Sequence, residues 1–240
     1  MTIVILAGGK SQRMGNDKAF LPYKRNTFIS AIVSEMLAIS DDIIVVIGAK
    51  NPSRFMEEIV DKRVRFVKDR RYISNPLGGM LTGFELATSR YAAVIACDLP
   101  LVKKELILAL FAAAEGHDAA VPIWNPKDKF STEPLCAVYN VQSMIRTINH
   151  SLSKGEFGCK RVVMALGDLN CIPVARLREC DPELDSLKNI NTKEDYLDLL
   201  EGLKLSATNS RPAVRVKRPQ IPGYARPRGI TEELHTGSHV

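Results

Sequence analysis

Short apolar runs alternate with longer amphipathic stretches along most of the chain. The runs are rich in Val and Ile and lack polar alternation, which is typical of strands in a sheet covered on both faces. They predict strands at Ile3–Leu6, Ile43–Ile47, Val64–Val67, Ala92–Cys97, Ala119–Pro122, Leu135–Tyr139 and Cys171–Val174. The other stretches predict helices at Thr27–Ala38, Pro52–Val60, Gly79–Ala87, Lys103–Ala114, Val141–Asn149, Cys159–Ala165 and Lys193–Leu203. This alternation predicts a doubly wound, mostly parallel α/β sheet.

A glycine-rich stretch, L-A-G-G-K-S-Q-R-M-G-N-D-K, begins at Leu6, where the first apolar run ends. Gly8 and Gly9 permit close backbone approaches, and successive free N–H groups in such a turn form a concavity suited to phosphate oxygens. Arg13 and Lys18 add positive charge. The stretch therefore predicts a polyphosphate cradle. The alternative is an ordinary turn between strand and helix with solvated basic side chains.

A second candidate site is Asp98, which directly follows the apolar run Tyr91–Cys97. In a doubly wound sheet, ligands bind beyond the carboxyl ends of the strands, so Asp98 is expected at the same edge as the glycine-rich stretch. Mg²⁺ bound to phosphate oxygens needs only one or two protein carboxylates. Asp98 is thus a candidate Mg²⁺ ligand, and the alternative is a cap for the helix that begins near Lys103.

A third candidate region follows the strand that ends at Val67. Asp69 stands beside Arg70 and Arg71, with which it could simply form surface ion pairs. Further on, N-P-L-G-G at positions 75–79 is typical of a turn that opens a helix, whose free N–H groups suit an anion or a polar edge.

Charge is distributed unevenly along the 240 residues, whose net charge is +6. From position 204 onward there are seven basic and two acidic residues, so this segment carries +5 and the remaining body about +1. The body therefore gives no reason to expect nucleic-acid binding. The segment is also rich in proline and lacks apolar periodicity. We expect residues 1–203 to form one domain and residues 204–240 a disordered basic tail, either a solvated extension or an arm for an anionic partner.

Composition bears on the cellular compartment in which the protein is expected. No apolar run is long enough to cross a bilayer, and nothing resembles a signal peptide, so no membrane association is expected. The five cysteines form no C-x-x-C pair, which argues against a zinc site or a disulfide framework. Reduced thiols and a cytoplasmic location are expected.

The glycine-rich stretch resembles the signature L-A-G-G-x-S-x-R-M-G-x-D-K of nucleotidyltransferases related to the molybdenum cofactor guanylyltransferases. Four further motifs follow in the family's order: P-L-G-G at position 76, C-D-L-P at 97, P-L-C-A-V-Y at 134 and N-I-N-T-K-E-D at 189. The chain departs from the family at Asn75, where glycine is frequent, and at Lys193, where proline is usual. The resemblance covers roughly residues 2–200 and implies the Rossmann-like nucleotidyltransferase fold.

The resemblance also implies roles for individual residues. Leu6, Ala7, Gly8 and Gly9 would cradle the nucleotide through backbone N–H groups. Arg13 and Lys18 would neutralise the phosphates, Asp69 would contact the nucleotide, and Asp98 would hold the metal. Asn189 and Asn191 would face the acceptor, although Thr192 and Asp195 in the same motif also form a helix capping box.

The implied reaction is Mg²⁺-dependent transfer of GMP from GTP to the phosphate of molybdopterin, with release of pyrophosphate. Gly8 favours GTP, because related cytidylyltransferases tend toward L-A-A-G. A molybdoenzyme or a cofactor chaperone would be the protein partner. Two alternatives remain: cytidylyl or guanylyl transfer to another phosphorylated acceptor, such as a sugar phosphate or phospholactate, and nucleotide binding without turnover.

Overall fold

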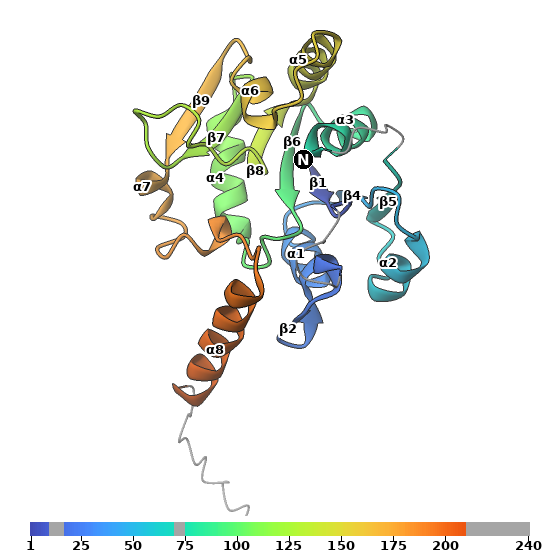
Figure 1. Cartoon of the computed structure of the whole chain (residues 1–240), viewed down its shortest axis with the longest axis vertical. Helices are drawn as coiled ribbons and strands as arrows, with labels where there is room; N and C mark the ends of the chain where they lie inside the picture. Colours follow the sequence, from blue (N-terminus) through green and yellow to red (C-terminus); the bar gives the residue numbers. More distant parts are fainter. Residues whose placement is uncertain (10–16, 70–74, 210–240) are drawn as a thin grey trace, which may run out of the picture.

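The computed structural model describes residues 1–9, 17–69 and 75–209. A seven-stranded sheet runs through the body in the order β5-β4-β1-β6-β8-β7-β9 (Figure 1). Its strands are β1 (Thr2–Leu6), β4 (Asp42–Val46), β5 (Val64–Val67), β6 (Tyr91–Ala96), β7 (Ala119–Ile123), β8 (Cys136–Asn140) and β9 (Leu169–Pro173). Only β8 runs antiparallel to its neighbours, so the sheet is mostly parallel, as the sequence predicts.

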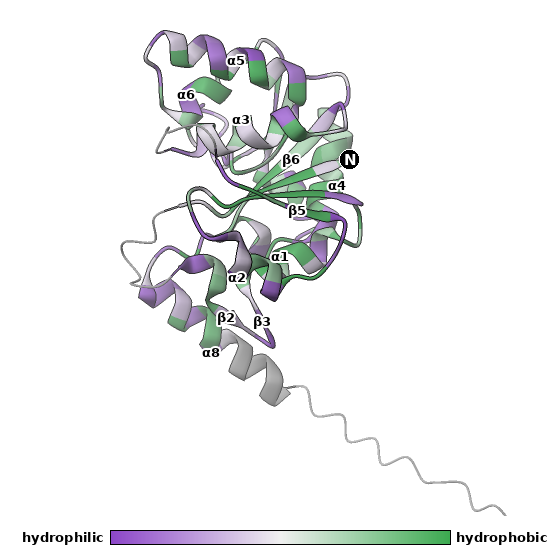
Figure 2. Cartoon of the chain, turned by 90° about the vertical axis from the view of Figure 1, so that its right-hand side faces the viewer, coloured by the Kyte–Doolittle hydropathy of each residue, from purple (hydrophilic) through white to green (hydrophobic). Residues whose placement is uncertain are grey.

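Helices cover both faces of this sheet. The helices of the described residues are α1 (Phe28–Met36), α2 (Pro52–Glu58), α3 (Pro76–Leu86), α4 (Lys104–Ala114), α5 (Val141–Ser153), α6 (Cys159–Val163), α7 (Val174–Leu177) and α8 (Lys193–Asn209), with 3₁₀ turns η1 (Lys18–Phe20) and η2 (Asp185–Leu187). Figure 2 shows α3, α5 and α6 on one side of the strands and α1 and α2 on the other. The predicted doubly wound α/β fold is confirmed.

Successive residues of the central strands supply two separate cores. On β1, Ile3 and Ile5 pack with α1 and α4, whereas Val4 packs with α3 and α5 on the opposite face. Because side chains alternate between the two faces of a strand, a sheet covered on both sides needs apolar residues at every position. This explains why the strands appear in the sequence as unbroken apolar runs.

Local sequence signals start several of the helices. Asn75 caps α3 by accepting a hydrogen bond from the Leu77 N–H at 2.9 Å, and Pro76 follows at the first helical position. Both choices favour a helix start. Gly83 lets α3 lie directly on β1, because a Cβ atom at Gly83 would come within 2.3 Å of the Val4 side chain. Nearer the start of α3, a Cβ atom at Gly79 would come within 3.1 Å of the Leu6 side chain, so the first turn of α3 lies beside the end of β1.

Three differences from the sequence-based expectations have simple causes. The hairpin of β2 (Pro22–Tyr23) and β3 (Asn26–Thr27) is not predicted, because two-residue strands leave no periodic pattern. Helix α3 begins three residues before the predicted start, since glycines weaken a helical pattern in the sequence. Helix α8 continues to Asn209, and residues 210–240 lie outside the described part of the chain, so the predicted domain boundary stays a prediction.

Helix α8 extends away from the sheet, at the lower edge of Figure 1. Its first turns are anchored to the body: Tyr196 packs on the Phe28 ring and donates a hydrogen bond from its hydroxyl to the Pro22 carbonyl at 2.8 Å. Within the described ranges, no helix is long and apolar enough to cross a membrane.

Candidate active site

The candidate site lies where the direction of the sheet's winding reverses. From β1 the chain moves outward to β4 and β5 and then returns to the other side of β1 as β6. Crevices for ligands form beyond the carboxyl ends of strands at such a switch point. The Cys97 N–H donates to the Leu6 carbonyl at 3.1 Å, so the two strand ends lie side by side. The predicted glycine turn and the predicted metal ligand therefore share one edge.

Three of the predicted residues meet at this edge. The Lys18 ammonium donates a hydrogen bond to Asn191 Oδ1 at 2.8 Å and lies 3.9 Å from Asp98 Oδ2. The Ile190 N–H donates to the Asp98 carbonyl at 2.9 Å, which holds the asparagine segment against the end of β6. Residues separated by most of the chain thus form one cluster, with a cation, an anion and an amide in contact.

Asp98 carries an oxygen with an unmet bonding requirement. Its side chain is 23% exposed, yet Oδ1 is buried and has no hydrogen-bond partner among the described residues. Burial raises the pKa of the Asp98 carboxyl above its usual value, and the nearby Lys18 ammonium opposes this only in part. A desolvated carboxylate with a free oxygen is costly to keep in the folded protein unless something binds it.

The alternative role of Asp98 as a helix cap does not match the geometry. Helix α4 begins after Lys103, whose N–H donates to Ser186 Oγ at 2.9 Å. The next N–H, that of Lys104, donates to Glu35 Oε1 at 3.1 Å. The start of α4 is therefore satisfied by residues other than Asp98.

The Asp98 carboxylate fits a hard divalent cation. Its free Oδ1 is a donor of the chemistry that Mg²⁺ prefers, and one carboxylate suffices when phosphates and waters complete the coordination. No cluster of three or more His, Cys, Asp or Glu side chains is found in the described ranges. A cation here would therefore depend on its bound substrate for most of its ligands.

The glycine turn is exposed and closely packed at its base. The Ala7 N–H donates to the Val46 carbonyl at 2.8 Å, so it continues the strand pairing and is not free for a nucleotide. Gly8 and Gly9 are exposed and can present their N–H groups. A Cβ atom at Gly8 would lie 2.8 Å from the Gly48 backbone nitrogen, so this close approach itself requires glycine at position 8.

Asp69 lies at the same edge, after β5. Its N–H donates to the Gly48 carbonyl at 3.1 Å, and its Oδ1 accepts a hydrogen bond from the buried Thr82 hydroxyl of α3 at 3.0 Å. Arg70 and Arg71, the alternative partners from the sequence, lie outside the described residues, and so does Arg13. Asp69 therefore joins the end of β5 to α3, next to the glycine turn.

The N-I-N-T-K-E-D segment contains the predicted capping box. The Asp195 N–H donates to Thr192 Oγ1 at 3.1 Å, and Asp195 Oδ2 accepts from the N–H groups of Asn191 and Thr192. The side chain of Asn191 takes no part in the cap and binds Lys18 instead. Asn189 is exposed one residue before the buried Ile190. The cap and the asparagine side chains are thus separate features of one motif.

Sequence reasoning missed Lys50, which lies on the loop between β4 and α2. Its ammonium donates to the Ala7 carbonyl and to Asp17 Oδ1, both at 2.6 Å. The segment I-G-A-K that contains it has no family signature and only one glycine. The only available signal was position, because the β4–α2 loop follows a parallel strand at the ligand edge.

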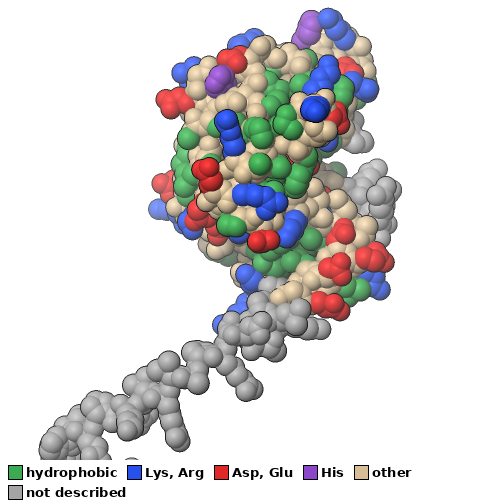
Figure 3. Space-filling model, turned by 90° about the vertical axis from the view of Figure 1, so that its left-hand side faces the viewer, with side chains coloured by type: hydrophobic (Ala, Val, Ile, Leu, Met, Phe, Trp, Pro, Cys, Tyr) green, Lys and Arg blue, Asp and Glu red, His purple; other side chains and the backbone are tan. Residues whose placement is uncertain are grey.

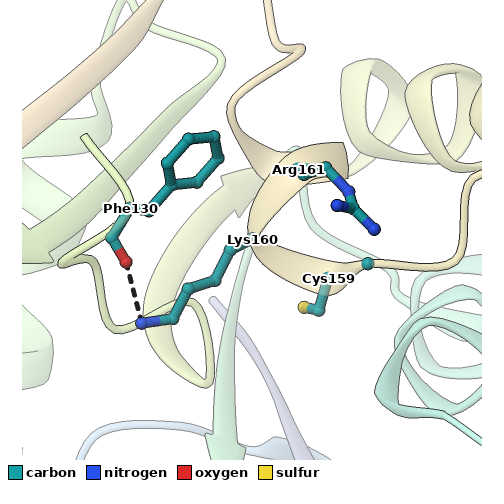
Figure 4. Close-up of a pocket in the computed structure, with 5 residues that line it drawn as sticks. Phe130, Cys159, Lys160 and Arg161 are labelled. Carbon is teal, nitrogen blue, oxygen red and sulfur yellow. Dashed lines mark hydrogen bonds between the residues drawn. The ribbon is translucent and has the colours of Figure 1, made fainter. Parts of the chain in front are cut away.

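A separate hollow of about 420 Å³ lies between α6 and the loop before β8 (Figure 4). It is lined by Phe130, Gly158, Cys159, Lys160 and Arg161, none of which the sequence singled out. Lys160 Nζ donates to the Phe130 carbonyl across it at 2.9 Å. Seen from the left-hand side of Figure 1, hydrophobic side chains lie among basic and acidic ones on the surface of the molecule (Figure 3).

Comparisons with known proteins agree with this architecture. Residues 3–170 match the family described as the MobA-like NTP transferase domain. A probable molybdenum cofactor guanylyltransferase of Methanosarcina mazei is 32% identical over 206 residues, covering 84% of this chain and 90% of the relative. A molybdenum cofactor guanylyltransferase of Desulfosudis oleivorans is 32% identical over 196 residues, covering 81% and 92%.

A solved structure gives the same fold. Molybdopterin-guanine dinucleotide biosynthesis protein A of Archaeoglobus fulgidus superposes with a TM-score of 0.70 at 22% identity, over 87% of this chain and all of that one. The matched family model and the curated relatives show that this sheet, with the glycine turn at its switch point, is a nucleotidyltransferase domain. The chain belongs to the MobA-like NTP transferase family.

Proposed function

We propose that this enzyme transfers GMP from GTP to the phosphate of molybdopterin, with Mg²⁺ as its cofactor. The observation that carries the proposal is the cluster of Lys18, Asp98 and Asn191 at the switch point, where a triphosphate and its acceptor can be held together. The names of the relatives supply the base and the acceptor, and Gly8 agrees with the guanylyltransferase signature.

The nucleotide side of the site would be formed by backbone and charge together. The N–H groups of Gly8 and Gly9 would bind phosphate oxygens, with the end of β1 at Leu6 and Ala7 as their support. Arg13 and Lys18 would neutralise the phosphate charge. Asp69, oriented by the Thr82 hydroxyl, would fix the nucleotide beside the start of α3.

In the reaction, an oxygen of the acceptor phosphate attacks the α-phosphorus of GTP in line. A new oxygen–phosphorus bond forms, the bond between the α-phosphorus and its bridging oxygen breaks, and pyrophosphate leaves with that oxygen. Such chemistry depends on positioning and charge neutralisation. Asp98 Oδ1 would hold the Mg²⁺, which when bound withdraws charge from the phosphate oxygens. Lys18 would stabilise the charge that accumulates on the phosphates.

Asn191 would connect the two substrates. Its carbonyl oxygen holds the Lys18 ammonium, so its amide group is left to donate toward the acceptor, with Asn189 beside it. No covalent intermediate is needed. Burial raises the pKa of the neighbouring Cys97 thiol to about 12, which keeps this sulfur protonated and a poor nucleophile.

The cellular setting is also part of the proposal. All five cysteines are free thiols, as expected for a protein of the cytoplasm. The product would pass to a molybdoenzyme or to a chaperone that delivers the cofactor.

Calorimetry with Mg²⁺ and GTP, CTP or ATP tests the base specificity. We expect GTP to bind at least about tenfold more tightly than CTP, a difference of about 1.4 kcal/mol. Tighter binding of CTP would mean that the enzyme transfers CMP and not GMP. Equal, weak binding of all three nucleotides would contradict the proposed function.

A further inference from the structure

Lys50 binds both Ala7 and Asp17, which precede and follow positions 10–16 in the sequence. Its Nζ lies 2.6 Å from the Ala7 carbonyl oxygen and 2.6 Å from Asp17 Oδ1. The side chains of Lys50 and Asp17 are 23% and 21% exposed, so the pair is largely shielded from water. An exposed ion pair contributes little to stability. This ammonium also binds a backbone carbonyl, so the β4–α2 loop, the glycine turn and the start of η1 all meet at one charge.

The loop that carries Lys50 is itself fitted to the glycine turn. The Lys50 N–H closes a turn on the Ile47 carbonyl at 3.2 Å, and within it Gly48 adopts a φ of +63°, which favours glycine. The backbones of Gly48 and Gly8 are in direct contact, and the Gly48 carbonyl accepts the Asp69 N–H. The β4–α2 loop thus contacts both the glycine turn and the aspartate expected at the nucleotide.

The bond to Ala7 has a consequence for the next residue. In a trans peptide the carbonyl and the following N–H point in opposite directions. With the Ala7 carbonyl held on Lys50, the Gly8 N–H lies in the same peptide plane and points away from the Lys50 ammonium. Loss of the ammonium would release this peptide, and the Gly8 N–H would no longer have one set direction.

The bond to Asp17 acts on Lys18. Asp17 begins η1 by accepting the Ala19 N–H at 3.2 Å, and Ala19 and Phe20 are buried in the main core. Lys18 is the first residue of this turn and reaches Asn191 and Asp98 from there. Without its cation, Asp17 would be a shielded carboxylate lacking its counter-charge, and the start of η1 would be free to shift.

We propose that Lys50 is a positioning residue for triphosphate binding. It acts through Ala7 and Asp17, and so sets the direction of the Gly8 N–H and the place of the Lys18 ammonium without touching the substrate. This inference rests on the proposed function, because it needs a nucleoside triphosphate in the crevice. Its specific consequence is that Lys50 matters for the β- and γ-phosphates and little for the guanosine.

Equilibrium binding of Mg²⁺-GTP and of GMP to the full-length chain tests this role. Lys50→Met should weaken GTP binding about tenfold or more and change GMP binding by less than about threefold. Lys50→Arg keeps a cation but has a different shape, so it should restore part of the loss. Lys62→Met, on an exposed lysine of the loop before β5, is the matched control and should bind both nucleotides as wild type does.

The outcomes separate the alternatives. Equal losses for GTP and GMP would reduce Lys50 to a general structural role and overturn the inference, as would unchanged GTP binding. If Lys50→Met does not fold, the same comparison of GTP and GMP affinities is made with Lys50→Arg and with Asp17→Asn, a variant that keeps an acceptor oxygen. A wild type that binds neither nucleotide contradicts the proposed function and, with it, this inference.

Discussion

At the scale of single residues, the metal-binding role that we propose for Asp98 and the stability of the fold make opposite demands on this residue. The carboxylate is largely withdrawn from water and one of its oxygens has no partner in the described ranges, whereas its neighbour Lys18 is only 3.9 Å away. A group in this state destabilises the free protein and is ready to bind a cation. Lys18 and Asp98 can therefore be told apart by what their removal does to folding and to activity.

Replacing Lys18 by Ala should lower pyrophosphate release at least about a hundredfold, because the phosphates lose a preorganised positive charge. The measurement is the rate of pyrophosphate formation at saturating GTP and molybdopterin. Lys154→Ala, on an exposed lysine after α5, should leave the rate unchanged. Near-normal turnover of the Lys18 variant would remove this residue from the mechanism.

Replacing Asp98 by Asn should abolish the response of the rate to Mg²⁺ while leaving the protein at least as stable. Burial raises the pKa of the Asp98 carboxyl, so the charged form costs stability at neutral pH and a neutral amide relieves that cost. Magnesium titrations and thermal unfolding check the two effects. Asp41→Asn, on an exposed carboxylate, is the control. An unaltered Mg²⁺ titration would return Asp98 to a structural role.

At the scale of elements, the N-I-N-T-K-E-D segment, which we propose faces the acceptor, is held in place from outside the site. Asp181 is fully buried and accepts hydrogen bonds from Lys103 Nζ at 2.5 Å and from the Ser186 N–H at 2.8 Å. The Ser186 hydroxyl in turn accepts the Lys103 N–H. This network fastens the segment before Ile190 to the start of α4, and so brings Asn191 to Lys18.

The same network predicts how stability depends on pH. Burial alone would raise the pKa of Asp181, but the hydrogen bonds from Lys103 and Ser186 outweigh it and hold the pKa below the ordinary value of 3.8. A carboxyl whose pKa is lower in the folded than in the unfolded protein stabilises the fold fully at pH values above the unfolded-state pKa. This stabilisation is lost as the pH falls through the folded-state pKa. Asp181→Asn should therefore flatten the acid side of the unfolding curve below about pH 4 and cost about 1–3 kcal/mol at pH 7.

Urea unfolding between pH 2 and 7 makes this measurement, with Asp41→Asn, on an exposed carboxylate, as the control. An Asp181 variant with the same stability and the same acid slope would contradict the network. Because the network lies behind the segment that we propose faces the acceptor, the variant should also lose turnover more than GTP binding.

At the scale of the whole molecule, the switch point explains why distant motifs meet. Periodicity predicted the strands, the doubly wound fold and the shared edge of the glycine turn and Asp98, since all of these follow from local pattern and known topology rules. The contact between Lys18 and Asn191 could not be predicted, because it depends on how the chain after β9 returns to the site. Lys50 was missed for a related reason, as its partners are set by the close approach of two loops.

The most direct test of the account is a product assay with purified enzyme, molybdopterin, Mg²⁺ and GTP labelled at the α-phosphate. We predict that the label passes to a molybdopterin guanine dinucleotide with one pyrophosphate released for each dinucleotide formed, and that Lys18→Ala and Asp98→Asn lose this transfer. Label that remains in GTP, or that is released as GMP without a dinucleotide, would contradict the account.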